Sequence, residues 1–177
     1  MTTEWMQYAD VTRWADGSLG WVHLVAGLAA VAIGPVILLG RKGTVRHRVY
    51  GYVYVALMMG LNLSALSMYE LNGRPNLFHL FAVISLLTIL PGIYCAIRAR
   101  RRGERRAIIA HYHFMSWSYF GLLAALFSQI VTRIDPAILG LDLPPRAMIV
   151  YGVGIAAIGA SIFINVRAGR IVTRYVS

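Results

Sequence analysis

Residues 19–40 read LGWVHLVAGLAAVAIGPVILLG, and residues 41–48 continue as RKGTVRHR. The first stretch contains no Lys, Arg, Asp or Glu. A bilayer core about 30 Å thick is crossed by roughly 20 mostly apolar helical residues, so this stretch predicts a transmembrane helix. The basic run after it predicts a loop at the membrane surface, because charged side chains are costly within the hydrocarbon.

The same pattern recurs along the chain. The stretches long and apolar enough to span a bilayer are 19–40, 49–70, 77–98, 111–133 and 146–167. They are continuously apolar, whereas the strands of a membrane barrel are short and alternate in polarity. The chain is 58% hydrophobic and only 14% charged, against about 25% charged residues in soluble domains. We therefore expect an all-α integral membrane protein.

The basic residues indicate the orientation of the helices. The loops after the first, third and fifth spans hold thirteen of the 17 Lys and Arg residues and a single acid, Glu104. By the positive-inside rule these loops are cytoplasmic, with the amino terminus outside and the carboxyl terminus inside. A formal charge of +10 would suggest nucleic-acid binding in a soluble protein. Here the charges flank membrane spans, so we expect contact with the lipid bilayer and no nucleic acid.

We expect three segments along the chain. Residues 1–18 form an amino-terminal interfacial segment outside, residues 19–133 a four-helix up-down transmembrane bundle, and residues 134–177 the fifth transmembrane helix and a cytoplasmic tail. In the first segment the apolar side chains have roughly helical spacing, at Trp5, Tyr8, Val11 and Trp14. This segment lacks the basic start of a cleavable signal peptide, so we expect none.

An internal repeat supports the four-helix bundle. A histidine is followed by a Gly/Pro pair, a basic turn with glycine, and a second histidine that opens the next span. The first copy contains His23, Gly34-Pro35, Arg41-Lys42-Gly43 and His47, and the second contains His79, Pro91-Gly92, Arg101-Arg102-Gly103 and His111. Two such helical hairpins pack naturally as a bundle.

The histidines of this repeat form candidate haem sites. Diagonal helices of an up-down bundle bring His23 opposite His79 near the outer surface, and His47 opposite His111 near the inner one. Haem iron takes axial histidines, so we predict a b-type haem, one or two per chain, that transfers electrons. His113 could replace His111 as the ligand.

Residues beside these histidines could accommodate the cofactor. Gly27 and Gly51 follow His23 and His47 by four residues, which places each glycine on the same helix face as its histidine and leaves space for a ring. Arg46 and Arg48 flank His47 and could bind haem propionates through charge-assisted hydrogen bonds.

Two alternatives remain open. Zinc or copper could bind to His47, His111 and His113 in a membrane enzyme, although residues two apart do not face each other on a helix. Asn62 and Gln129 could line a quinone or small-molecule pocket of a transporter, although the first four spans hold no charged residue at their centres. The sequence does not identify the redox partner, and a homo-oligomer is possible.

The sequence resembles a bacterial family of predicted membrane proteins known as domain of unknown function 2306. The resemblance covers about residues 20–130. It is carried by His23-Leu-Val-Ala-Gly27, Gly34-Pro35, Arg41-Lys42-Gly43-Thr-Val-Arg-His47-Arg48, Gly51-Tyr-Val-Tyr54, and Pro91-Gly92-Ile-Tyr through His111. It implies a location in the bacterial cytoplasmic (inner) membrane. It also marks His23, His47 and His111 as motif positions.

The histidine layout is also similar to that of cytochrome b561-type dihaem bundles. This similarity implies a membrane oxidoreductase that moves electrons between reductants or quinones. The chain departs from those proteins because it has no recognisable ascorbate or quinone signature, and because Val83 occupies the position four residues after His79.

Overall fold

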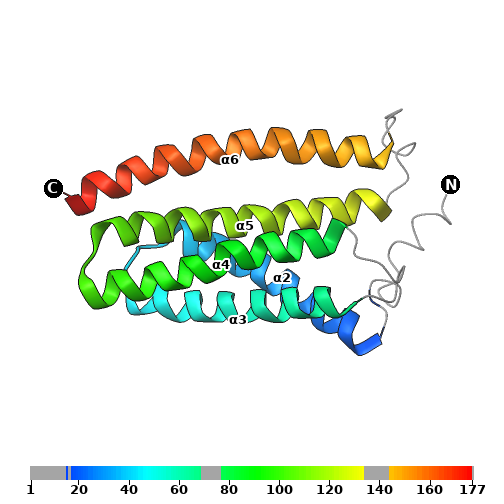
Figure 1. Ribbon diagram of the computed structural model, residues 1–177, viewed down its shortest axis with the longest axis horizontal. Helices are drawn as coiled ribbons and strands as arrows, with labels where there is room; N and C mark the ends of the chain where they lie inside the picture. The colour runs from blue at the N-terminus through cyan, green and yellow to red at the C-terminus, as the bar shows by residue number, and fades with distance from the viewer. Residues whose placement is uncertain (1–14, 16, 69–76, 134–143, 177) are drawn as a thin grey trace. The chain divides into compact units, whose positions relative to one another are not determined.

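The structure, a computed structural model, describes residues 15, 17–68, 77–133 and 144–176. These residues are helical throughout apart from short turns, and they contain no strand. The helices are α2 (Gly17–Leu39), α3 (Val45–Ser67), α4 (Leu77–Arg102), α5 (Arg105–Arg133) and α6 (Pro145–Val176), as Figure 1 shows. The expected all-α class is confirmed. The expected interfacial segment, with Trp5, Tyr8, Val11 and Trp14, lies outside the described residues.

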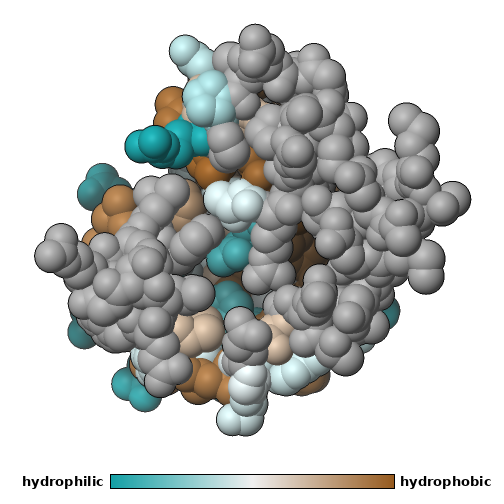
Figure 2. Space-filling model, turned by 90° about the vertical axis from the view of Figure 1, so that its right-hand side faces the viewer, coloured by the Kyte–Doolittle hydropathy of each residue, from teal (hydrophilic) through white to brown (hydrophobic). Residues whose placement is uncertain are grey.

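All five described helices are long and apolar enough to cross a membrane. Many of their large apolar side chains face outward, and brown, hydrophobic atoms lie at the surface in Figure 2. On α6, for example, Val150, Ile155 and Ile158 are 68%, 72% and 65% exposed. Water would oppose the exposure of so much apolar area, whereas lipid acyl chains accommodate it. The helices are therefore suited to a lipid bilayer.

Two helices begin earlier than hydropathy predicts. α3 begins at Val45 instead of residue 49, and α5 begins at Arg105 instead of residue 111. Hydropathy marks the part of a helix inside the hydrocarbon, while the helix itself continues through basic residues in the headgroup layer. At α3 the start is set by Thr44, whose side chain accepts a hydrogen bond from the backbone N–H of His47 and so acts as the N-cap.

The described chain divides into two compact units, Met1–Val83 and Ile84–Ser177, with the boundary inside α4. In the first unit, α2 packs against α3 in a helical hairpin. α2 buries small residues spaced four apart, which are Ala26, Ala30 and Gly34, and α3 buries Tyr54, Met58 and Leu61. A Cβ atom added to Gly27 of α2 would lie 3.2 Å from Cδ1 of Leu61 of α3. Small residues let two helix backbones approach closely in a membrane.

In the second unit, α5 packs against α6. Tyr112 of α5 forms a buried cluster with Ile164 and Ala168 of α6. Farther along, a Cβ atom added to Gly152 of α6 would lie 2.6 Å from Cε1 of Phe127. The missing side chain at Gly152 therefore admits the phenyl ring of α5. A single four-helix bundle over residues 19–133 stays a prediction.

The burial of Ala30 in α2 predicts the effect of enlarging this small residue. Ala30 is fully buried, whereas Ala32 is exposed on the same helix. We expect Ala30→Leu to lower the free energy of unfolding by about 1–3 kcal/mol, because the added atoms must displace the side chains packed around this buried position. Thermal unfolding of the purified protein in detergent measures this as a lower midpoint. Ala32→Leu is the matched control, and an equal shift in both variants would contradict the packing.

Candidate functional site

A rigid turn joins α2 to α3. The ammonium group of Lys42 donates hydrogen bonds to the carbonyl oxygens of Ile37 (2.6 Å) and Leu38 (2.8 Å), which lie in the last turn of α2. These carbonyls have no partner within the helix, so Lys42 acts as a C-terminal cap. Gly43 adopts a positive φ of 77°, which glycine adopts without steric cost. Thr44 then caps α3, and the turn is fixed at both ends.

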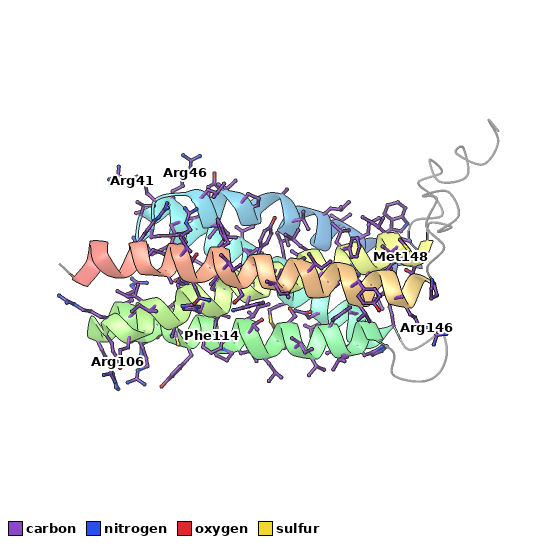
Figure 3. All side chains as sticks on the ribbon, turned by 90° about the horizontal axis from the view of Figure 1, so that it is seen from above. Arg41, Arg46, Arg106, Phe114, Arg146 and Met148 are labelled. Carbon is purple, nitrogen blue, oxygen red and sulfur yellow. The ribbon has the colours of Figure 1, made fainter. Side chains whose placement is uncertain are left out.

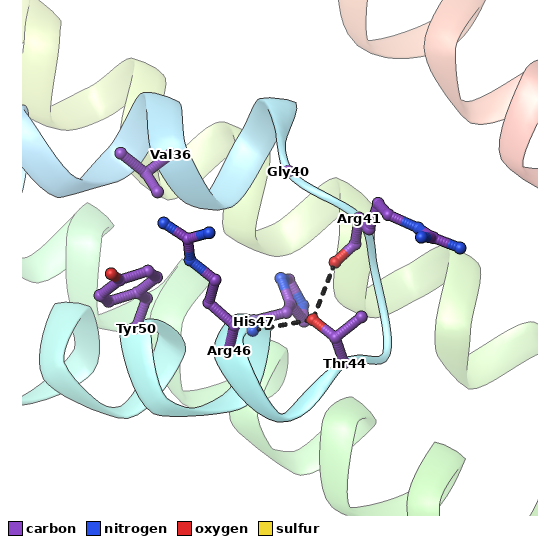
Figure 4. A pocket seen from close by; sticks show the side chains of 7 residues that line it. All are labelled: Val36, Gly40, Arg41, Thr44, Arg46, His47 and Tyr50. Carbon is purple, nitrogen blue, oxygen red and sulfur yellow. Dashed lines mark hydrogen bonds between the residues drawn. The ribbon is translucent and has the colours of Figure 1, made fainter.

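This turn forms one side of a pocket of about 370 Å³. The lining residues, drawn in Figure 4, are Val36, Gly40, Arg41, Thr44, Arg46, His47 and Tyr50. The pocket brings together two residues of the predicted inner site, His47 and Arg46. The other three, Arg48, Gly51 and His111, are not among its lining residues.

His23 is held against α3 by its Nδ1 atom. This atom lies 3.2 Å from the carbonyl oxygen of Leu61 and 3.1 Å from the Oγ of Ser64. The Ser64 hydroxyl donates its own proton to the Leu61 carbonyl at 2.9 Å, so both neighbours of Nδ1 act as acceptors. Nδ1 must therefore carry the ring proton, and Nε2 keeps its lone pair.

His111 shows the same arrangement in the second unit. Its Nδ1 lies 2.9 Å from the carbonyl oxygen of Gly92 in α4. A carbonyl oxygen can only accept, so Nδ1 is again protonated and Nε2 is the basic nitrogen. The neighbouring His113 instead packs its ring edge-on against Tyr112, with 5.8 Å between ring centroids. The second hairpin thus singles out His111 over His113 as a fixed imidazole.

The glycine of the second repeat has a packing role. A Cβ atom added to Gly92 would lie 2.8 Å from Sδ of Met115 and 3.3 Å from Cβ of Phe114. The absence of a side chain lets α5 come close enough for His111 to reach the Gly92 carbonyl. In the second copy of the repeat, Gly92 and His111 are therefore in direct contact.

Gly27 and Gly51, the predicted spaces for a cofactor ring, have different surroundings. A Cβ atom added to Gly27 would lie 3.2 Å from Cδ1 of Leu61, so α3 packs directly against this glycine. A Cβ atom added to Gly51 would meet nothing within 4 Å, and this side of α3 is open. Their roles as cofactor contacts stay predictions.

For the two predicted histidine pairs, the structure shows the surroundings of the single histidines but does not test the pairing. His79 is buried in α4, at 7% exposure, and belongs to the same unit as His23. The hydrogen bonds of His23, however, go to α3. His47 belongs to the first unit and His111 to the second, so their pairing stays a prediction.

The described part of the chain contains no group of side chains that could hold a metal ion with three ligands. No three His, Cys, Asp or Glu side chains converge there. His111 and His113 both lie within α5, where residues two apart point in different directions.

Sequence reasoning did not identify Ser64 or the two acceptor carbonyls. The sequence spacing did contain a signal for these contacts, because residues at equal distances before and after a tight turn meet in a hairpin of antiparallel helices. His23 and Leu61 lie at equal separations from Lys42, on opposite sides of the turn. Gly92 and His111 flank the second turn in the same way.

The bond from His23 to α3 predicts the effect of removing one acceptor. We expect Ser64→Ala to lower the free energy of unfolding by roughly 0.5–1 kcal/mol, because the Nδ1 proton loses one of its two acceptors. Ser67→Ala on the same helix is the control, since its exposed hydroxyl bonds only to its own helix at Leu63. Unfolding in detergent measures both variants, and equal stability of the two would count against the contact.

Comparisons with known proteins identify the family. Neither a curated protein nor a solved structure matches the chain. A family model described as "Predicted membrane protein (DUF2306)" matches residues 20–165. The match extends beyond the 20–130 expected from the sequence and includes much of α6. The chain therefore belongs to this family of predicted membrane proteins.

Proposed function

We propose that the chain is a b-type haem protein of the membrane that transfers electrons, with His23 and His111 among its axial ligands. The observation that supports this most is the contact of each Nδ1 with a carbonyl oxygen across its hairpin, because a carbonyl oxygen accepts and the contact therefore needs a proton on Nδ1. Histidines that bind metals usually donate their other ring N–H to a carbonyl or carboxylate. Nε2 is then the nitrogen that would bind the iron.

The residues around each histidine would prepare it for this role. The Leu61 carbonyl and the Ser64 hydroxyl restrict rotation of the His23 ring, and the Gly92 carbonyl does the same for His111. A hydrogen bond from Nδ1–H also raises the basicity of Nε2 and thereby strengthens a bond to iron. Haem, when bound, supplies reversible one-electron chemistry.

The second ligand of each site follows from the repeat. We propose His79 as the partner of His23, and His47 as the partner of His111. His79 is buried as a ligand within a bundle would be, and His47 lines the pocket at the α2–α3 turn. A quinone or a redox protein is the proposed electron partner, because a haem that transfers electrons needs a donor and an acceptor.

The proposed location is the bacterial cytoplasmic membrane, with the amino terminus outside. The support comes from the basic turns. Arg41 and Arg46 lie at one end of the α2–α3 hairpin (Figure 3). In the second unit, Arg106 at the start of α5 and Arg146 at the start of α6 lie at opposite ends of the unit in the same figure, as alternating helix directions require.

The haem proposal predicts a coloured protein. Material purified from cells supplied with haem should show a sharp Soret band that shifts when dithionite reduces the iron. His23→Gly and His111→Gly should each lower the haem-to-protein ratio, because each removes an axial nitrogen. Free imidazole added to either variant should restore the spectrum.

His113→Gly is the matched control, since it changes the same helix two residues from His111. It should retain the haem content of the unmodified protein. Gel filtration establishes that each variant is folded. A colourless protein, or glycine variants of His23 and His111 that retain as much haem as the His113 variant, would contradict the proposal.

A further inference from the structure

Two arginines of the α2–α3 turn, Arg41 and Arg46, have no acidic partner among the described residues. Glu104 is the sole carboxylate side chain in the described part of the chain, and it pairs with Arg98 at 2.8 Å. Lys42 bonds to backbone carbonyls at the end of α2. The guanidinium groups of Arg41 and Arg46 have no ion pair within the residues that the structure describes. Their charge therefore calls for an anion from outside this part of the chain.

Arg46 is directed into the pocket. In Figure 4 its guanidinium group crosses from α3 toward α2 and lies between Val36 and Tyr50. Its central carbon is 5.6 Å from the centroid of the Tyr50 ring, a distance typical of a cation–π contact. Arg41 points away from this group in the same view. Arg46 is thus the cation held in place over an apolar wall.

The position of the pocket relative to the bilayer indicates which anion it would meet. α3 contains 23 residues and is about 34 Å long at about 1.5 Å per residue. The hydrocarbon core is only about 30 Å thick, and the charges of Arg46 and Arg48 favour the first turn of α3 as the part that lies in the layer of lipid headgroups. Phosphate groups are concentrated in this layer. Guanidinium groups bind phosphate through two parallel hydrogen bonds.

We infer that this pocket binds a phosphate group, with Arg46 as its principal ligand. The favoured source is an anionic phospholipid, because the polar end of the pocket, at Arg46 and Thr44, adjoins the apolar side chains of Val36 and Tyr50. Such a surface matches the junction between the headgroup phosphate and the acyl chains of a phospholipid. A volume of about 370 Å³ is within the usual range for small-molecule pockets. This inference does not depend on bound haem.

The experiment compares Arg46 with a neighbouring arginine outside the pocket. Delipidated protein in neutral detergent is titrated with short-chain phosphatidylglycerol, and bound lipid is counted by native mass spectrometry. We expect Arg46→Gln to weaken binding by about tenfold or more, which corresponds to one charge-assisted hydrogen-bonded contact. Arg48→Gln removes the same charge beside the pocket and should change binding by less than about twofold, as a screened surface charge does. Arg46→Lys should be intermediate, because it keeps the charge but loses the planar fork.

Further titrations identify the source of the phosphate. Inorganic phosphate that fails to displace the lipid at millimolar concentration supports the headgroup. Displacement that depends on Arg46 supports a soluble phosphate in the same site.

Equal losses of lipid binding in Arg46→Gln and Arg48→Gln would overturn the inference, because non-specific attraction between the basic turn and the lipid charge would then explain the binding. Loss of haem with unchanged lipid binding in Arg46→Gln would also overturn it, since Arg46 would then serve a cofactor carboxylate. The lipid measurement works equally on colourless protein, so it can fail or succeed independently of the haem proposal.

Discussion

A ring N–H placed within a membrane span must find an acceptor, because the hydrocarbon offers no water. His23 and His111 both meet this requirement with a backbone carbonyl of the helix that precedes or follows them. The Leu61 carbonyl also accepts a hydrogen bond from the Ser64 hydroxyl of its own helix, so the two donors share this acceptor. The helix backbone thereby positions the imidazole without any charged residue inside the membrane.

Close helix packing makes these bonds possible. The missing side chain of Gly27 brings α2 against Leu61 of α3, and that of Gly92 brings α5 against α4. Each histidine then reaches a carbonyl that a larger residue would hold out of range. The bond decides the tautomer, and the tautomer decides which nitrogen can bind a metal. Small residues thus allow the close packing, the packing allows the hydrogen bonds, and the hydrogen bonds determine which nitrogen the proposed ligation would use.

Much of the fold was predictable from the sequence, because the length of an apolar stretch must match the bilayer. The helix ends were less so, since Thr44 and the basic residues after it extend α3 outside the hydrocarbon, where hydropathy carries no information. Histidine positions were visible in the repeat, but their partners were not. The acceptor at Leu61 is a backbone atom, so its residue type gives no sign of it. Ser64 resembles any hydroxyl that bonds to its own helix, and its contact with His23 depends on the rotation of α3 about its axis.

The account depends most directly on which ring nitrogen carries the proton. Nitrogen-15 NMR of histidine-labelled protein, prepared without haem at a pH where imidazole is neutral, distinguishes the two tautomers. Signals can be assigned by replacing His23 and His111 one at a time. The account predicts that both rings are protonated at Nδ1 and unprotonated at Nε2. A proton on Nε2 of either ring, with Nδ1 bare, would contradict the bonds to Leu61 and Gly92 and remove the basis for ligation by that histidine.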